Sequence, residues 1–171
     1  FTVPVSGGHP QQLPLPNAVK ASYSPDGARL AYTPLGERFR VWKNYRGGRQ
    51  SRIWIYDVND HSVVEIPKPA GGCNDTDPMW GADGSVYFRG EDDATRAFNI
   101  WRMNADGGDR RRLTDFEHEG VRNARISRDG ARIVFEAGTG DFLYGYGAFP
   151  APNNPSAPAF SNIVIGEGGP E

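Results

Sequence analysis

The chain contains a short unit that returns along its length, and such a repeat constrains the fold more than any single motif. Residues Ser24–Tyr32 read SPDGARLAY, residues Ser127–Phe135 read SRDGARIVF, and a looser copy surrounds Asp83-Gly84. Asp bonds its own backbone in tight turns and Gly adopts the backbone conformation that closes them. The apolar residues that alternate after the turn are typical of a strand with one buried face. Each copy therefore predicts a turn followed by a strand.

A second repeat lies between these copies. Residues Phe1–Leu13 align without a gap with Trp101–Leu113, and Trp54–Ile66 fits the same frame. Each copy predicts a strand, a polar or glycine turn and a second strand, so one full period holds four strands. Trp54 and Trp101 are 47 residues apart, and blades of β-propellers repeat at about 40–50 residues. We therefore predict an all-β partial β-propeller of about three four-stranded antiparallel blades, with an irregular C-terminal tail.

The repeats also set the expected domain boundaries. The propeller segment covers residues 1–145, with a partial blade at 1–16, blades at 17–69 and 70–116, and an incomplete blade at 117–145. In this last blade, Phe142–Tyr144 falls where a third strand is due. Residues 146–171 are rich in proline, alanine and glycine and are expected to be a tail of unknown structure. The apolar run Ser161–Ile165 within this tail has no predicted place.

Composition argues against several classes of function. The net charge of −2 gives no long-range field toward nucleic acid, and the chain has no run of about 18 apolar residues that could cross a membrane. The single cysteine rules out an internal disulfide and leaves the compartment open, with cytoplasm slightly favoured over periplasm. The run Arg110–Arg112 is expected to protect a solvated strand edge, because a nucleic-acid site would need interleaved aromatic residues.

The sequence predicts no catalytic residue, no metal site and no cofactor in this chain. His9, His61 and His118 fall at turns or connections, and the Gly-x-Ser-x-Gly motif of a nucleophile elbow is absent. The acidic residues between Asp75 and Asp93 lack the spacing of a calcium loop. Turn chemistry, in which Asp and Asn bond their own backbone, accounts for them.

Four stretches together resemble the N-terminal propeller of tricorn-type serine proteases and, more generally, TolB-like and WD40-like propeller repeats. They are Phe1–Gly8 (FTVPVSGG), Trp42–Gly48 (WKNYRGG), Ile53–Ile55 (IWI) and Asn74–Trp80 (NDTDPMW). The resemblance covers about residues 1–138. It implies a non-catalytic propeller segment that admits peptides and guides them to a serine peptidase unit downstream, beside a PDZ-like module. The implied partners are peptides or the rest of the parent chain, with no nucleic acid and no membrane, and the parent is expected to be a homo-oligomer.

The long connection in the first full blade contains the best candidate for peptide binding. Lys43, Arg46 and Arg49 surround Gly47-Gly48 and alternate with two aromatic residues. Guanidinium groups bind carboxylates in a bidentate fashion, and glycines permit backbone N–H groups to approach an anion. One hypothesis is that these cations contact the C-terminal carboxylate of a substrate. In the alternative, the aromatic residues hold the loop on its blade and the cations are solvated.

Two other functions remain open on the sequence alone. The chain could be a TolB-like protein-interaction module, or the propeller lid of a prolyl-oligopeptidase-like enzyme that filters peptides by size. The sequence that follows this segment discriminates among the three functions, and none of them predicts peptidase activity in the segment itself. Because an open row of blades leaves unpacked faces, we also expect this segment to associate with itself.

Overall fold

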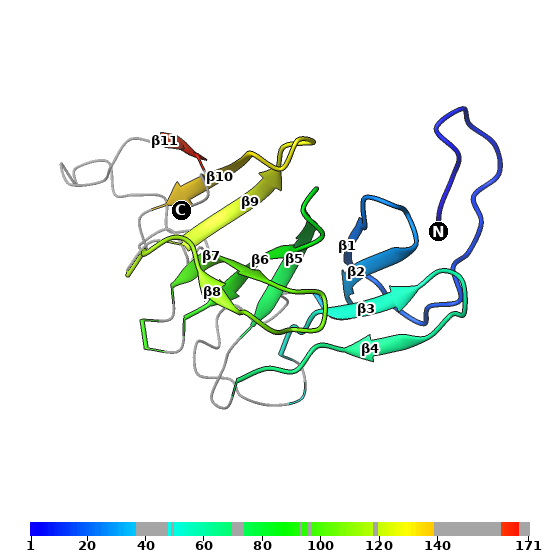
Figure 1. The fold of residues 1–171 in the computed structure, drawn as a ribbon, viewed down its shortest axis with the longest axis horizontal. Helices are drawn as coiled ribbons and strands as arrows, with labels where there is room; N and C mark the ends of the chain where they lie inside the picture. Colours follow the sequence, from blue (N-terminus) through cyan, green and yellow to red (C-terminus); the bar gives the residue numbers. More distant parts are fainter. Residues whose placement is uncertain are drawn as a thin grey trace, which may run out of the picture.

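The computed structural model describes residues 1–36, 48, 50–69, 74–92, 94–95, 97–117 and 120–138, together with the backbone of residues 162–167. The described residues form eleven strands in three antiparallel sheets, which stand in a row from the N-terminal to the C-terminal end of the molecule (Figure 1). This arrangement confirms the predicted all-β partial propeller. Within this described part, no helix is long and apolar enough to span a membrane.

The first two sheets each contain four strands, and each strand pairs with the next one in sequence. The first sheet consists of β1 (Lys20–Tyr23), β2 (Arg29–Thr33), β3 (Trp54–Asp57) and β4 (Val63–Glu65). The second consists of β5 (Asp75–Trp80), β6 (Val86–Glu91), β7 (Phe98–Met103) and β8 (Arg111–Arg112). Both sheets are the up-and-down meanders that the four-strand period predicts.

The third sheet differs in the origin of its third strand. It consists of β9 (Gly120–Ile126), β10 (Arg132–Gly138) and β11 (Asn162–Glu167), in the order β11-β10-β9. Residues Phe142–Tyr144, where the third strand was expected, lie outside the described residues. The third place beside β10 is taken by β11, which includes most of the apolar run that the sequence left unplaced.

The turns between first and second strands reproduce the repeated unit in atomic detail. In the first sheet, Ser24 Oγ donates a hydrogen bond to Asp26 Oδ1 at 2.5 Å, and Ser127 Oγ donates to Asp129 Oδ1 at the same distance in the third sheet. The glycines that follow have φ of 71° and 74°. The Asp carboxylate also accepts the backbone N–H two residues on, at 3.0 Å in both turns. The same residues therefore build the same turn about 100 residues apart.

The turns between third and fourth strands keep the gap-free register of the second repeat. Equivalent residues are paired across three hairpins: Thr2 with Gln11, Ile55 with Val64, and Arg102 with Arg111. Gly7 and Gly107, at equivalent turn positions, have φ of 90° and 89°. Trp54 and Trp101 both lie on third strands, each opposite an aromatic residue of the second strand. Residues 1–16 therefore correspond to the third and fourth strands of a blade.

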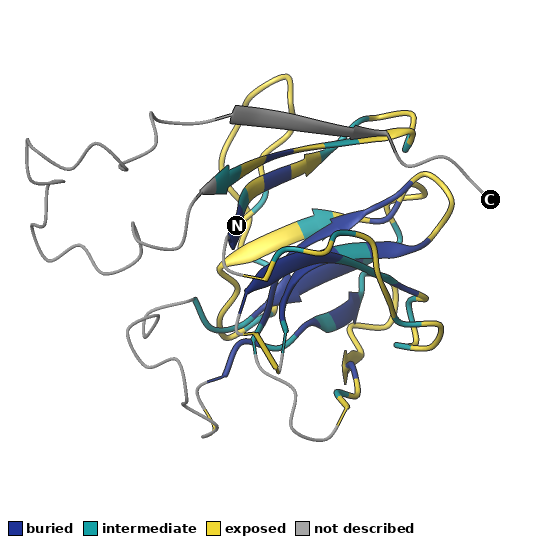
Figure 2. Cartoon of the chain, turned by 90° about the vertical axis from the view of Figure 1, so that its left-hand side faces the viewer, coloured by how far each residue is buried: buried dark blue, intermediate teal, exposed yellow. Residues whose placement is uncertain are grey.

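Three apolar cores hold this row together, one at each junction. Figure 2 shows buried strands (dark blue) between exposed hairpin ends (yellow). The N-terminal segment meets the first sheet through Leu13, Leu15, Leu30, Tyr32 and Tyr56. The first sheet meets the second through Ala31, Ile53, Ile55, Ile66, Trp80, Val86, Phe88 and Met103. The second sheet meets the third through Met79, Ile100, Val121, Ala124 and Phe135. The first and second sheets thus each have an apolar core on both faces.

Candidate functional site

The first strands of the three sheets, β1, β5 and β9, lie along one side of the row and are called the inner strands below. Strand β1 contacts β5, and β5 contacts β9, so these three edges converge. In a propeller the blades surround a central channel, and converging first strands line it. The inner strands are therefore the edge at which such a channel would lie, and their exposed polar side chains are the candidates to face it.

The inner strands of the second and third sheets each carry a β-bulge at the same position. Counting back three residues from the end of each inner strand gives Lys20, Asp77 and Asn123. Asp77 and Asn123 have φ of 50° and 48°, in the left-handed region that Asp and Asn tolerate better than most residues. At both places two inner-strand residues lie opposite a single partner residue, which defines a β-bulge. Strand β1 has no such shift, and Lys20 pairs in regular register.

The bulge in β5 directs Asp77 into a network that connects all three sheets. Arg89 on β6 donates from its guanidinium to Asp77 Oδ2 at 2.5 Å, and Arg89 Nε donates to the carbonyl oxygen of Val121 on β9 at 2.6 Å. The Lys20 ammonium lies 3.4 Å from Asp77 Oδ1, as an ion pair without hydrogen-bond geometry. The Arg89 guanidinium also lies over the Phe98 ring, 4.6 Å from its centre.

This network is buried and charged. The side chains of Asp77 and Arg89 are only 7% and 5% exposed, whereas that of Lys20 is 49% exposed. Burial raises the pKa of Asp77, but the Arg89 guanidinium and the Lys20 ammonium together outweigh burial and bring the pKa below its ordinary value. Asp77 is therefore an ionised carboxylate at neutral pH, held between two cations.

The bulge in β9 repeats this geometry with different chemistry. Asn123 Nδ2 donates to Glu136 Oε2 at 2.9 Å, and both side chains are exposed. Glu136 stands on β10 where Arg89 stands on β6, because Phe88 and Phe135 before them both lie opposite the bulges. The third sheet therefore offers an exposed amide on its inner strand, bonded to a carboxylate on the adjoining β10, and the first sheet offers an exposed ammonium on its inner strand.

The two bulges were not predicted from the sequence, and the turn role predicted for two acidic residues is wrong. Asp75 and Asp77 were assigned to turn chemistry, but both are buried within β5. Asp75 binds Arg110 through two hydrogen bonds of 2.8 Å. Asp92 does accept backbone N–H groups from Ala94 and Thr95, so turn chemistry is confirmed there. Aligning the copies would have placed Asp77 and Asn123 in one column, and that is the signal that could have found the bulges.

Arg110 also differs from its expected role as a solvated edge residue. Its side chain is 14% exposed, and its guanidinium lies over the rings of Phe88 and Trp101, 4.7 and 5.0 Å from their centres. Arg111, the next residue, is exposed as expected. The expectation failed for Arg110 because its carboxylate partner, Asp75, is 35 residues away in sequence.

The predicted peptide-binding residues Lys43, Arg46 and Arg49 lie outside the described residues. The described residues on either side of their loop are tied together, since Ser51 Oγ donates to the carbonyl oxygen of Leu35 at 2.9 Å. The backbone N–H of Ser51 donates to Asn74 Oδ1 at 2.9 Å, next to the start of β5. The base of the loop is therefore fixed at the same end of the inner strands as the bulges.

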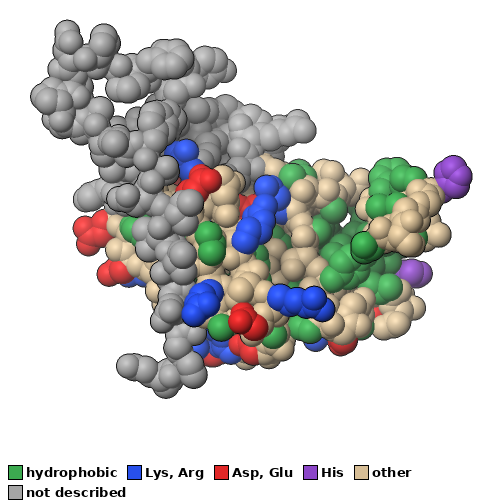
Figure 3. Space-filling model, turned by 90° about the horizontal axis from the view of Figure 1, so that it is seen from above, with side chains coloured by type: hydrophobic (Ala, Val, Ile, Leu, Met, Phe, Trp, Pro, Cys, Tyr) green, Lys and Arg blue, Asp and Glu red, His purple; other side chains and the backbone are tan. Residues whose placement is uncertain are grey.

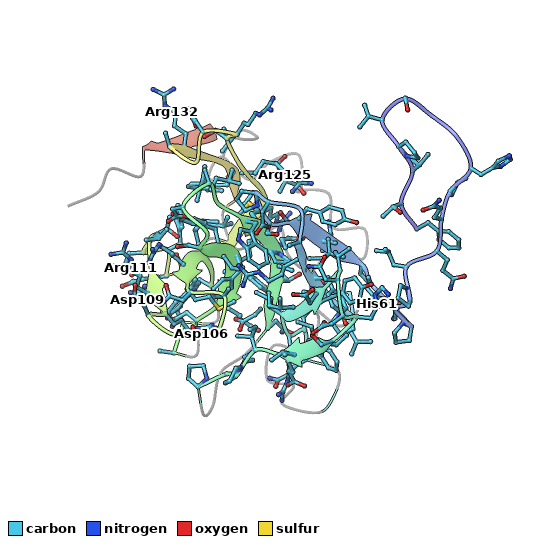
Figure 4. The ribbon with its side chains drawn as sticks, turned by 45° about the vertical axis from the view of Figure 1, so that its right-hand side comes forward. His61, Asp106, Asp109, Arg111, Arg125 and Arg132 are labelled. Atoms are coloured by element: carbon cyan, nitrogen blue, oxygen red, sulfur yellow. The ribbon has the colours of Figure 1, made fainter. Side chains whose placement is uncertain are left out.

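The described histidines do not form a catalytic group. His61 lies in the β3–β4 turn, away from Arg125 and Arg132 on the third sheet (Figure 4). Its Nδ1 is 2.6 Å from the Tyr56 hydroxyl. His9 is exposed, and His118 lies outside the described residues. In the part of the chain that the structure describes, His, Cys, Asp and Glu form no group that could hold a metal ion.

Comparison with known proteins gives the chain a family. Residues 1–144 match the model of the tricorn protease N-terminal beta propeller domain. The chain is 30% identical over 133 residues to "Tricorn protease homolog 1" of Streptomyces coelicolor, covering 78% of this chain and 12% of that protein. It is 32% identical over 119 residues to "Uncharacterized peptidase YuxL" of Bacillus subtilis, covering 70% of this chain and 17% of that protein. The chain thus spans less than a fifth of either relative.

Solved structures agree with this match. The tricorn protease superposes with a TM-score of 0.55 at 26% identity, over 74% of this chain and 12% of that chain. TolB from Acinetobacter baumannii superposes with a TM-score of 0.55 at 19% identity, over 90% of this chain and 30% of that chain, which supports the fold alone. The chain belongs to the family of tricorn protease N-terminal beta propeller domains.

Proposed function

We propose that this chain is the non-catalytic propeller part of a serine peptidase and that it admits peptides and guides them to a catalytic unit elsewhere in the polypeptide. Both curated relatives carry a peptidase name, and the family model is that of a protease propeller. The observation that carries the proposal is the row of polar groups on the inner strands. Lys20 on β1 and Asn123 on β9 are exposed there, and Asn123 donates to the exposed Glu136 of the adjoining strand β10.

A peptide in extended form has unpaired N–H and C=O groups and charged ends. Exposed amide, carboxylate and ammonium groups can bond it without reading a particular side chain. The buried Asp77–Arg89 pair between them fixes the relative position of the sheets, so that these groups keep their spacing. This combination suits passage of many sequences better than tight binding of one.

In this proposal Lys43, Arg46 and Arg49 contact the C-terminal carboxylate of the peptide. Support comes from the base of their loop, because Leu35, Ser51 and Asn74 anchor it at the bulged end of the inner strands. A cation held near that end adds charge-assisted hydrogen bonds to a free carboxylate. Such bonds contribute about 1.5–3 kcal/mol each, so losing one weakens binding by about tenfold or more.

The test is fluorescence polarisation with a labelled peptide that has either a free or an amidated C-terminus. We expect the native chain to bind the free form at least tenfold more tightly, and the variant Arg46→Ala/Arg49→Ala to lose this difference. The matched control is Arg111→Ala, which removes an exposed cation on the outer strand β8 and leaves both affinities unchanged. Equal affinity of the native chain for both peptides contradicts the role of the loop. Absence of binding to either peptide contradicts the guiding function.

A further inference from the structure

An open groove of about 520 Å³ lies between the first two sheets, beside the hairpin turns of the first. Strands β2, β3 and β4 line it on one side, and the turn between β7 and β8 lines it on the other. Arg29 begins β2 and Asp57 ends β3, and the two residues lie opposite each other. Leu35 and Ser51, at the base of the long loop, lie beyond the other ends of these strands. The groove is therefore a different surface from the one to which the proposed function refers.

Three charged side chains line this groove, those of Arg29, Asp57 and Asp106. In the part of the chain that the structure describes, none of the three forms an ion pair, and the Arg29 guanidinium lies over the Trp80 ring, 5.0 Å from its centre. Elsewhere pairing is common, and carboxylates bind the guanidinium groups of Arg52, Arg89, Arg102, Arg110 and Arg112. Figure 3 likewise shows acidic side chains (red) beside basic ones (blue) on one face of the molecule. The groove thus gathers charges that the described part of the chain does not neutralise.

Asp57 and Asp106, called the groove carboxylates below, each have one oxygen available to a ligand. Asp57 Oδ1 accepts the backbone N–H of Asn59 at 2.8 Å, and Asp106 Oδ1 accepts that of Gly108 at 2.9 Å. Among the described residues, no hydrogen bond reaches Oδ2 of either carboxylate. With two carboxylates and one guanidinium, the groove has a net negative charge and attracts a cation.

The repeat shows which cation fits this place in a blade. In the gap-free register of the second repeat, Ile55 on β3 corresponds to Arg102 on β7. The Arg102 guanidinium donates to Asp109 at 2.9 Å and lies 3.5 Å from Asp83, and its side chain is only 18% exposed. In the second sheet, therefore, a guanidinium stands between carboxylates at this position. In the first sheet the shorter, apolar Ile55 takes the position, and the groove carboxylates lie around it.

The groove also borders an exposed strand. Strand β4 is the outermost strand of the first sheet, its residues are exposed, and no described strand pairs with its outer edge. Val64 on β4 is 57% exposed and lines the groove together with Ile55 and Ala105. An extended polypeptide can lie along such an edge and place one side chain in the adjacent groove.

We propose that this groove binds an arginine side chain carried by an extended segment of another polypeptide. The guanidinium donates to the groove carboxylates, and the aliphatic part of the side chain contacts Ile55 and Val64. Arg29 donates to a backbone carbonyl oxygen of the same segment. Arginine fits better than lysine, because a planar guanidinium has donors for two carboxylates at once, as Arg102 shows in the second sheet. This inference is independent of the proposed peptide guiding.

Fluorescence polarisation with blocked peptides tests the assignment of the ligand. The probe is fluorescein-labelled Gly-Val-Arg-Val-Gly with an amidated C-terminus, and its matched control has citrulline, which keeps the shape of arginine without the charge. We expect the arginine peptide to bind at least about tenfold more tightly than the citrulline peptide, and a lysine peptide to bind more weakly than the arginine peptide. Equal affinity for the arginine and citrulline peptides overturns the proposal, and equal affinity for the lysine peptide overturns its choice of a guanidinium.

Substitutions in the groove test its position. Asp57→Asn and Asp106→Asn should each weaken binding of the arginine peptide at least about tenfold, and an Asn Oδ1 can still accept the hydrogen bond that closes each turn. The matched control is Asp60→Asn, an exposed residue of the β3–β4 turn that does not line the groove and should leave the affinity unchanged. A loss for Asp60→Asn as large as that for Asp57→Asn overturns the proposal.

A guanidinium attached to the chain itself should compete with the peptide. Val64→Arg places one in the groove from an exposed position of β4, so binding of the arginine peptide should fall at least about tenfold without a lower melting temperature. Val63→Arg is the matched control, because Val63 is also exposed but lies on the other face of β4, and it should not change the affinity. Equal effects of the two substitutions contradict the proposal. Because the probe has no free carboxylate, failure here leaves the proposed role of the long loop to its own test.

Discussion

The substitution Arg89→Met removes the cation at the centre of the inner-strand network while keeping a side chain of similar length. Its partner Asp77 is 7% exposed and would keep only the Lys20 ammonium, 3.4 Å away and half solvated. Removing one partner of a buried ion pair costs about 3–5 kcal/mol, because the remaining charge is buried without compensation. A domain of this size has about 5–15 kcal/mol of stability in total, so the loss is a large share of it.

The stability difference between the native chain and Arg89→Met should also depend on pH. In the native chain the pKa of Asp77 is lowered below 3.8, so its stabilisation is complete above pH 3.8 and is lost as pH falls through the lowered value. Without Arg89, only the Lys20 ammonium opposes burial, so we expect the pKa of Asp77 to be higher in the variant than in the native chain. Once the pH is low enough to protonate Asp77 in both chains, its charge no longer distinguishes their stabilities. The difference between the two chains should therefore narrow on acidification.

Urea unfolding followed by tryptophan fluorescence at several pH values measures both effects. The double variant Asp77→Asn/Arg89→Met should recover part of the loss at pH 7, because no charge stays buried. Arg111→Met, an exposed residue on β8, is the matched control and should change stability by less than about 0.5 kcal/mol. A loss below about 1 kcal/mol for Arg89→Met, or a loss that does not change with pH, would refute the assigned role of the pair.

Three further predictions concern packing between the sheets. Phe88→Ala should cost about 3–5 kcal/mol in urea unfolding, since this side chain is 0% exposed at the junction of the first two sheets. Gly107→Ala should lower the melting temperature more than Gly7→Ala: both have φ near 90°, but only at Gly107 would a Cβ lie 2.9 Å from a side-chain methyl of the neighbouring sheet. Arg110→Lys should cost about 1–3 kcal/mol, because an ammonium cannot bind Asp75 through two parallel hydrogen bonds, and a cost near zero by the same assay counts against that role.

The part of this fold that could be predicted is the part with local causes. The turn at Ser24–Gly27 follows from four consecutive residues, and its copy at Ser127–Gly130 has the same hydrogen bonds. The matched places of Trp54 and Trp101 follow from a repeat that needs no gap. Local sequence and final structure agree wherever the determining contacts lie within one hairpin.

The candidate site was harder to predict because its contacts cross strands and sheets. Asp77 meets Arg89 only through a bulge that shifts the register, and Arg89 then reaches a carbonyl on another sheet. Asp77 was assigned to a turn because Asp is common in turns, and that preference carries no information on shifts of strand register. The loop cations Lys43, Arg46 and Arg49 remain a prediction, since they lie outside the described residues.

Each of the three apolar cores joins only two neighbouring units, and this determines where local unfolding begins. The second sheet packs against a neighbour on both faces, whereas the N-terminal segment and the third sheet each pack against a neighbour on one face. Opening therefore begins at the ends and reaches the middle last, so amide hydrogens in β6 and β7 should exchange with solvent far more slowly than those in β10. A destabilising substitution such as Phe88→Ala would weaken the junction between the first and second sheets and so uncouple the two halves of the row. A comparable substitution in an end unit would promote local unfolding of that unit alone.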